Sequence, residues 1–203
     1  MADFLFDIGK VLLDFDFESS LVTLLPPDHP APREALAKLI EKKDEFEAGK
    51  ISVGDYTQWA IETLETTATI EDFHASWQNI FTPNNAMWAA ARKLSSDGHR
   101  LILFSNTNGI HCPWIFQKYP EFSIFHGSIL SFEVDAIKPQ PLIYQHAIEK
   151  YSLVPEKTLY IDDLPANIRT GNEFGFRSHQ YDLNNHPAFE AWLAVEMGRL
   201  SLT

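Results

Sequence analysis

The chain has 203 residues, of which 45% are apolar and 22% are charged, and these values argue against intrinsic disorder. Its 28 acidic and 16 basic residues give a formal net charge of −12, which argues against binding to nucleic acid or to an anionic membrane surface. Its apolar runs are shorter than the roughly 20 residues of a membrane helix. We therefore expect one globular domain, or one domain with an insertion.

The N-terminus and the single cysteine both predict a cytoplasmic protein. The opening residues carry acids at Asp3 and Asp7 and lack a basic stretch before an apolar run, so they do not resemble a secretory signal. Cys112 has no second cysteine for a disulfide, which fits a reducing compartment. A lone cysteine can act as a nucleophile, but it is more often an inert packing residue, and we expect the second role. No obligate protein partner is evident.

Apolar runs that end at polar residues predict the strands of a parallel sheet. Clear strands are expected at residues 4–6, 101–104 and 158–161, with weaker candidates at 127–131 and 177–181, and a further apolar run follows Gly9 at 11–13. Helical patterns at 85–94 and 141–151 precede the runs that end at Ser105 and Asp162. Strand and helix signals that alternate at this spacing predict an α/β fold with a mostly parallel sheet.

The segment between the first strands and residue 85 has a different character. Helical periodicity is expected at residues 33–43, 53–64 and 70–81. Gly49–Ser52 is expected to be a turn in which Ser52 caps the next helix. We therefore expect a core formed by residues 1–14 and 86–203, and a helical cap formed by residues 15–85.

Three polar clusters follow the predicted strands, at Asp7, at Ser105–Asn106 and at Asp162–Asp163. The carboxyl ends of parallel strands are where such sheets bind ligands. Carboxylates suit Mg²⁺, while Ser105 and a lysine such as Lys138 suit phosphate. An aspartate beside the cation could attack phosphorus and form an aspartyl-phosphate. Each residue alone could be a turn former, a helix cap or a loop lysine, but their joint order favours a functional site.

In these motifs the sequence resembles the haloacid dehalogenase-like (HAD) superfamily. The matching segments are Asp7-Ile-Gly9-Lys-Val, Phe-Ser105-Asn-Thr-Asn, Ile-Lys138-Pro-Gln-Pro and Ile-Asp162-Asp163, which span most of the chain. Further detail, including Phe46-Glu-Ala-Gly-Lys-Ile-Ser, resembles the branch of capped phosphatases that holds the bacterial α-D-glucose-1-phosphate phosphatases and the N-terminal phosphatase domain of soluble epoxide hydrolase.

The resemblance implies a Rossmann-like core, a helical cap after the first strand, and Mg²⁺-dependent hydrolysis of a small phosphorylated metabolite, with a sugar phosphate as one candidate. Asp7 is implied as the nucleophile, and Gly9 as a metal ligand through its carbonyl. The implied residues are Asp7 and Lys138 for catalysis, Ser105, Asn106, Lys138 and His111 for the substrate, and Asp7, Gly9, Asp162 and Asp163 for the metal.

Position 9 departs from the family pattern. The second aspartate of the first motif normally protonates the leaving oxygen, and Gly9 has no side chain to do so. General acid–base catalysis contributes roughly 10²–10⁴-fold, so the loss matters. Candidates to replace it are Lys10, Asp14 and His111.

Two alternative functions remain open on the sequence. One is metal-independent 2-haloacid dehalogenation, which the adjacent acids Asp162 and Asp163 disfavour because that chemistry needs no cation. The other is a catalytically weak binding protein, which Gly9 and Lys10 favour. Substrate contacts are expected from the cap and from the loop after the second motif. The candidates are Phe46, Glu47, His111 and Trp114, whereas Trp59, Trp77 and Phe81 are expected to pack between cap helices.

Overall fold

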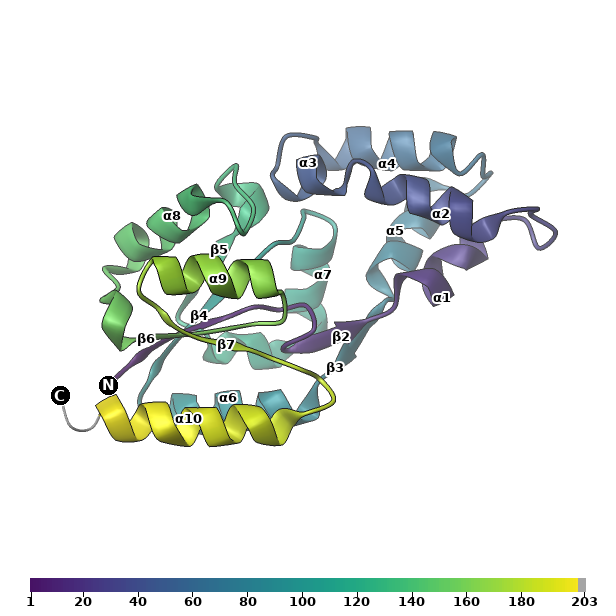
Figure 1. The fold of residues 1–203 in the computed structure, drawn as a ribbon. Helices are drawn as coiled ribbons and strands as arrows, with labels where there is room; N and C mark the ends of the chain where they lie inside the picture. Colours follow the sequence, from purple (N-terminus) through teal and green to yellow (C-terminus); the bar gives the residue numbers. More distant parts are fainter. Residues whose placement is uncertain (201–203) are drawn as a thin grey trace.

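The computed structural model describes residues 1–200 as two lobes, a sheet with helices on both faces and a smaller layer of helices (Figure 1). The sheet is parallel, with strand order β5-β4-β1-β6-β7. Its strands are β1 (Asp3–Phe6), β4 (Arg100–Ser105), β5 (Gly127–Leu130), β6 (Thr158–Asp162) and β7 (Arg177–Gln180). The α/β fold with a parallel sheet is therefore confirmed.

Helices cover both faces of the sheet because the side chains of the central strands alternate between two cores. Phe4 and Phe6 belong to one core, and Leu5 belongs to the other. The helices of the larger lobe are α6 (Asn85–Ser96), α7 (His111–Lys118), α8 (Pro141–Tyr151), α9 (Pro165–Glu173) and α10 (His186–Leu200). In Figure 1, α6 and α10 lie below the sheet, and α8 and α9 lie above it.

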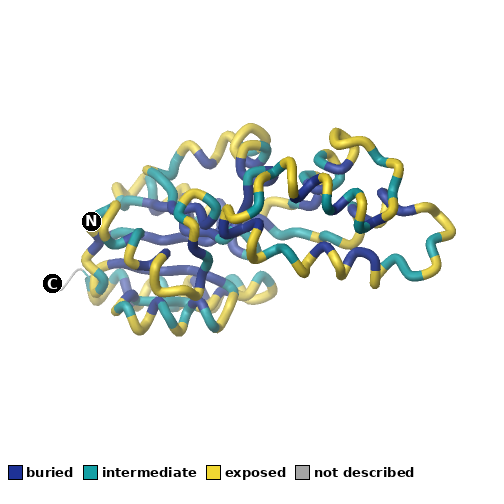
Figure 2. Tube along the Cα trace, turned by 90° about the horizontal axis from the view of Figure 1, so that it is seen from above, coloured by how far each residue is buried: buried dark blue, intermediate teal, exposed yellow. Residues whose placement is uncertain are grey.

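The smaller lobe, formed between β2 and β3, has a hydrophobic core of its own. Its helices are α1 (Phe17–Leu21), α2 (Pro32–Ile40), α3 (Lys43–Glu47), α4 (Val53–Thr63) and α5 (Ile70–Gln78). Tyr56, Phe73 and Trp77 are buried in its centre. Figure 2 shows buried stretches in both lobes. The Ser52 cap is confirmed, since its Oγ accepts from the Asp55 N–H at 3.1 Å.

The two lobes are joined by an antiparallel ribbon that the sequence did not predict. It consists of β2 (Leu13–Phe15) and β3 (Phe81–Pro83). Of the apolar run at 11–13, only Leu13 lies in a strand, because the Leu12 and Leu13 N–H groups both bond to the Ile8 carbonyl and form a turn. The helix expected to reach residue 81 ends at Gln78, and Phe81 pairs with Phe15 instead.

Short 3₁₀ helices complete the described chain. They are η1 (Val22–Leu24), η2 (Pro120–Ile124), η3 (Ser131–Glu133) and η4 (Pro155–Lys157). Among residues 1–200, no helix is both long and apolar enough to cross a membrane.

Candidate active site

The carboxyl end of the sheet brings the predicted residues together because β1 lies between β4 and β6. Asp7 follows β1, Ser105 ends β4 and Asp162 ends β6. Above these strand ends lies a pocket of about 160 Å³. The sequence-predicted residues that line it are Asp7, Gly9, Lys10, Ser105, Asn106, His111 and Asp163, and Glu47 reaches it from the smaller lobe.

Lys138 is held beneath this pocket as a fully buried cation. Its Nζ lies 3.2 Å from the Asp7 carboxylate and donates to Asp162 Oδ2 at 2.6 Å and to the Phe104 carbonyl at 2.7 Å. The two carboxylates raise the pKa of Lys138 against the effect of burial, so it remains an ammonium group. The Lys138 ammonium group thus makes two hydrogen bonds and an ion pair with Asp7 within the protein, and its side chain is fully buried. Lys138 therefore holds Asp7 in place, and its side chain is not open to the pocket.

Asp162 is the anchor of this network. Its side chain is fully buried and accepts hydrogen bonds from the Tyr160 hydroxyl at 2.6 Å and from the Leu164 N–H at 2.8 Å. Asn167 Nδ2 lies 3.0 and 3.1 Å from its two oxygens. Both oxygens are thus already bonded within the protein, in contrast to Asp163, which lines the pocket.

Tyr160 is a site residue that sequence reasoning missed. It lies in an apolar strand, and nothing in its type marks it as polar machinery. The period of two along β6 does place it on the same face as Asp162, and that pattern was the available signal.

Asp7 and Asp163 carry carboxyl groups that burial makes costly to ionise. Burial raises the pKa of Asp7 to about 7, with Lys138 opposing and Asp162 adding to the shift. Burial, with the nearby charge of Asp162, raises the pKa of Asp163 to about 6. Oxygens of these three aspartates lie within 4.8 Å of one another. Three carboxylates against one ammonium group, with only oxygen donors, make a set that fits a hard divalent cation.

Ser105 and Asn106 lie beside Asp7 and organise the loop around it. A hydrogen bond from Ser105 acts to lower the pKa of Asp7. The Asn106 side chain clamps the backbone of Lys138, accepting from its N–H at 2.7 Å and donating to its carbonyl at 2.9 Å. This clamp fixes the loop after β5 against the end of β4. The Asn106 side chain is thereby used, and the group left for a ligand is its backbone N–H.

The packing of Phe15 explains why position 9 is a glycine. A Cβ at this position would lie 3.0 Å from Cε1 of Phe15, tighter than an ordinary contact. The Phe15 ring thus occupies the space next to position 9. Lys10, with φ 55°, places its ammonium group 4.4 Å from the centre of the same ring and pairs with Asp14. That pair lowers the pKa of Asp14, which keeps this carboxylate ionised.

His111 lines the pocket as a neutral, fixed side chain. Its Nδ1 lies 3.1 Å from Asn108 Nδ2, and its Nε2 lies 3.0 Å from the Trp77 carbonyl. Burial lowers the pKa of His111 to about 3, so it carries no charge at neutral pH. Both ring nitrogens have protein partners, which leaves the ring, and not a nitrogen, to face a ligand. Asn108, which orients it, belongs to the second sequence motif, but the sequence did not indicate this role.

The other sequence candidates fall into two groups. Phe46 and Glu47 line a second cavity, of about 630 Å³, which lies between the lobes. Trp114 instead packs on Phe81 and Tyr119. Cys112 is buried, and burial raises the pKa of its thiol to about 12, so an unreactive packing role fits it.

Comparison with known proteins shows the family to which the chain belongs. The model of the haloacid dehalogenase-like hydrolases matches residues 4–175. The chain belongs to this family. Among curated relatives of this HAD protein is the D-ribitol-5-phosphate phosphatase of Bacteroides thetaiotaomicron, 25% identical, with 89% of this chain and 91% of that protein covered.

Solved structures support the same fold. A HAD family enzyme from B. thetaiotaomicron, in complex with magnesium and inorganic phosphate, matches with a TM-score of 0.77 at 21% identity, covering 90% of this chain and 95% of that one. A HAD-like hydrolase from Porphyromonas gingivalis matches at 0.76 and 23%, covering 95% and 98%. The L-2-haloacid dehalogenase of Xanthobacter autotrophicus matches less closely, at 0.64 and 15%, covering 88% and 76%.

Proposed function

We propose that this HAD protein is a Mg²⁺-dependent phosphatase that hydrolyses a small phosphomonoester through an aspartyl-phosphate on Asp7. The observation that carries the proposal is the cluster of Asp7, Asp163 and Lys138 at the end of the central strand, beside a pocket of about 160 Å³. The relative named as a D-ribitol-5-phosphate phosphatase, and the similar enzyme solved with magnesium and phosphate, support it. A sugar or polyol phosphate is one candidate substrate, because the curated relative is named as a D-ribitol-5-phosphate phosphatase.

In this mechanism an oxygen of Asp7 attacks phosphorus. The bond from phosphorus to the alcohol oxygen breaks, and its electron pair leaves with that oxygen, which takes up a proton. Water then attacks the aspartyl-phosphate, so that inorganic phosphate leaves and the carboxylate of Asp7 is restored. Gly9 supplies no proton, so the leaving oxygen takes its proton from another donor.

The other residues have roles that follow from their contacts. Lys138 keeps Asp7 in position at 3.2 Å, and Asp162 keeps Lys138 in position. Ser105 and the Asn106 N–H bind the phosphoryl oxygens. Asp7, Asp163 and the carbonyl of Gly9 would hold Mg²⁺, which supplies positive charge against the carboxylates and the transferring phosphoryl group.

The proposal extends to organisation and location. We place the core at residues 1–14 and 86–203 and the cap at 15–85, and the β2–β3 ribbon supports this division. We place the protein in the cytoplasm, because its single cysteine is free and buried. Its proposed partner is a small phosphorylated metabolite, which is the substrate of the proposed reaction. His111 contributes its ring to the lining of the pocket on the substrate side.

The test is phosphate release by the purified protein from p-nitrophenyl phosphate and from a panel of sugar, polyol and nucleotide phosphates. We expect release with Mg²⁺ and its loss when EDTA removes the cation. Release of chloride from L-2-chloropropionate, measured in parallel without a metal, would support the dehalogenase instead. If no ester of the panel releases phosphate, the proposal fails, and the absence of chloride release as well would favour a binding protein.

A further inference from the structure

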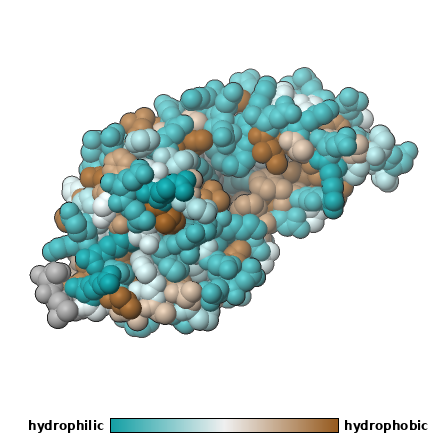
Figure 3. Space-filling view, in the orientation of Figure 1, coloured by the Kyte–Doolittle hydropathy of each residue, from teal (hydrophilic) through white to brown (hydrophobic). Residues whose placement is uncertain are grey.

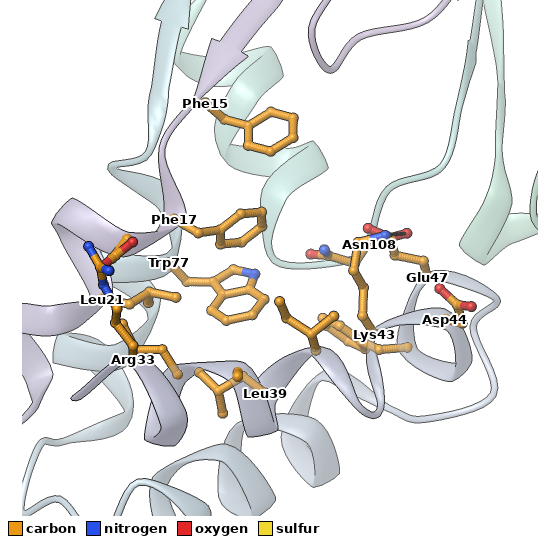
Figure 4. Close-up of a pocket in the computed structure, with 15 residues that line it drawn as sticks. Phe15, Phe17, Leu21, Arg33, Leu39, Lys43, Asp44, Glu47, Trp77 and Asn108 are labelled. Atoms are coloured by element: carbon orange, nitrogen blue, oxygen red, sulfur yellow. Dashed lines mark hydrogen bonds and ion pairs between the residues drawn. The ribbon is translucent and has the colours of Figure 1, made fainter. Parts of the chain in front are cut away.

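A second and larger cavity, of about 630 Å³, adjoins the active-site pocket on its cap side. It is bounded by side chains of α1, α2 and α3 and by Trp77 of α5, with Asn108 on the core side (Figure 4). Figure 3 shows the hollow between the two lobes, with hydrophobic residues at its edge. The volume is within the range of roughly 300–1,000 Å³ that is usual for small-molecule sites.

The cavity and the active-site pocket adjoin each other. Phe15, Phe17, Lys43 and Glu47 line both of them. The cavity is therefore a space in which a molecule with its phosphoryl group beside Asp7 can place its remaining atoms. Lys43 and Glu47 pair with each other at 2.6 Å at this junction.

The lining of the cavity is mainly apolar. Side chains of Leu21, Leu36, Leu39 and Phe46 form its apolar walls. Its charged and polar lining groups are largely paired within the protein: Glu18 with Arg33, Lys43 with Glu47, and Asn108 with His111, while Asp44 lies at the same end as Lys43. The hydroxyl groups of a polyol that lie against the leucine walls would have no hydrogen-bond partner there, and burial of each such group costs free energy. An apolar chain or ring would instead gain from leaving water.

One polar atom in this wall lacks a partner. The indole Nε1 of Trp77 is buried and has no hydrogen-bond partner, and the residue as a whole is only 4% exposed. Figure 4 draws the indole nitrogen on the side of the ring that faces the cavity. Buried N–H groups in proteins nearly always have an acceptor, because an unmade hydrogen bond costs roughly 1–3 kcal/mol. The cavity therefore fits a molecule that brings an oxygen to this position.

We propose that this cavity binds the leaving group of the substrate, and that this group is a bulky apolar alcohol with one oxygen that accepts a hydrogen bond from Trp77 Nε1. The inference rests on the phosphatase activity proposed above and adds its substrate class. It assigns to Trp77 a contact with substrate, whereas its ring also packs on Phe17 of the cap and on His111 of the core.

The test compares alkyl phosphates, whose leaving oxygens have similar basicity. We expect kcat/KM for heptyl phosphate to exceed that for ethyl phosphate by more than about tenfold, and to exceed that for glycerol 3-phosphate and ribitol 5-phosphate. Ala37→Trp places a large ring at an exposed lining position, and it should lower the heptyl-to-ethyl ratio about tenfold. Ala191→Trp, at an exposed position of α10, is the matched control and should leave the ratio unchanged.

The acceptor is tested with three ethers of the same length as heptyl phosphate, namely 2-butoxyethyl, 3-propoxypropyl and 4-ethoxybutyl phosphate. At least one should exceed heptyl phosphate about fivefold in kcat/KM, and Trp77→Phe should abolish that advantage while heptyl phosphate is still hydrolysed. The proposal is overturned if heptyl phosphate is no better than ethyl or ribitol 5-phosphate, or if no ether gains. If no ester at all releases phosphate, p-nitrophenyl phosphate included, it is the phosphatase activity that is refuted.

Discussion

The active-site pocket and the cap cavity of this HAD protein are built on opposite principles. Around Asp7 the buried polar groups are bonded to one another, and Lys138 and Asp162 each have protein partners for their charged atoms. In the cap cavity the walls are apolar, and the indole of Trp77 has an N–H without a partner. The difference teaches that the polar groups around Asp7 are held in place before any ligand binds, whereas the Trp77 N–H in the cap cavity would gain a hydrogen-bond partner only from a ligand.

The sharpest way to break this comparison is Asp7→Asn. If the core pocket carries the reaction, kcat should fall about 10⁴-fold or more, since a missing nucleophile is not replaced by its neighbours. The midpoint of urea unfolding should not fall, because burial already makes the charge of Asp7 costly. Phosphate release and urea denaturation measure the two effects. Asp28→Asn, at an exposed position, is the control, and equal activities of the two variants would refute the assignment.

Lys138→Met tests whether the core network is as tightly coupled as its contacts indicate. Removal of this buried cation leaves Asp7 and Asp162 without their shared partner, which should lower the free energy of unfolding by about 3 kcal/mol. Lys93→Met removes a surface pair with Asp97 and should change it by less than about 1 kcal/mol. Equal losses in urea denaturation would show that the buried network is no stronger than a surface pair.

The pH dependence of Mg²⁺ binding tests the electrostatics of the core pocket. The pKa values of Asp7 and Asp163, about 7 and about 6, lie above the ordinary 3.8, so the folded protein holds protons that the unfolded chain has released. Without Mg²⁺, this contribution to stability is present at low pH and is lost as pH rises from about 4 to about 7.

Mg²⁺ favours the ionised carboxylates, and the increase in Tm that it causes should therefore grow between about pH 5 and pH 8. Thermal unfolding with and without Mg²⁺ measures it. Asp163→Asn should reduce the increase at every pH, whereas Asp28→Asn should not. An increase in Tm that is independent of pH would contradict the raised pKa values.

The smallest effect concerns the border between the two regions. Gly9→Ala places a Cβ 3.0 Å from the Phe15 ring and should cost about 1 kcal/mol in unfolding free energy. Phe15→Leu should relieve this cost, so that the double variant is more stable than the sum of the two single changes predicts. Strict additivity in a double-mutant cycle would show that Phe15 does not occupy the space beside position 9.

The strands and helices that could be predicted from the sequence are those that produce a pattern within a short segment. Apolar runs ending at Asp7, Ser105 and Asp162 indicated the strands and the edge at which they meet, because strand burial and polar strand ends are properties of short segments. The helix from Ile70 was likewise visible in its periodicity, although its end was not. Phe81 pairs with Phe15 across more than sixty residues, and no local pattern carries such a pairing.

The features that were not predictable depend on tertiary contacts. The full set of partners of Lys138 and the neutral, bonded state of His111 follow from the burial of groups that are distant in sequence. Trp77 was expected to pack between cap helices, which it does, but only the folded chain shows that its Nε1 faces a cavity without an acceptor. The sequence predicted the groups of the proposed reaction, and the structure shows which residues hold them in place.

The central claim is that Asp7 becomes phosphorylated during turnover. It is tested most directly by quenching the wild-type protein in acid during hydrolysis of p-nitrophenyl phosphate with Mg²⁺, and then mapping its peptides by mass spectrometry. The account predicts one phosphoryl group on the peptide that contains Asp7, which is absent when EDTA replaces Mg²⁺. Rapid turnover with that peptide unmodified, or with the phosphoryl group on another residue, would contradict it.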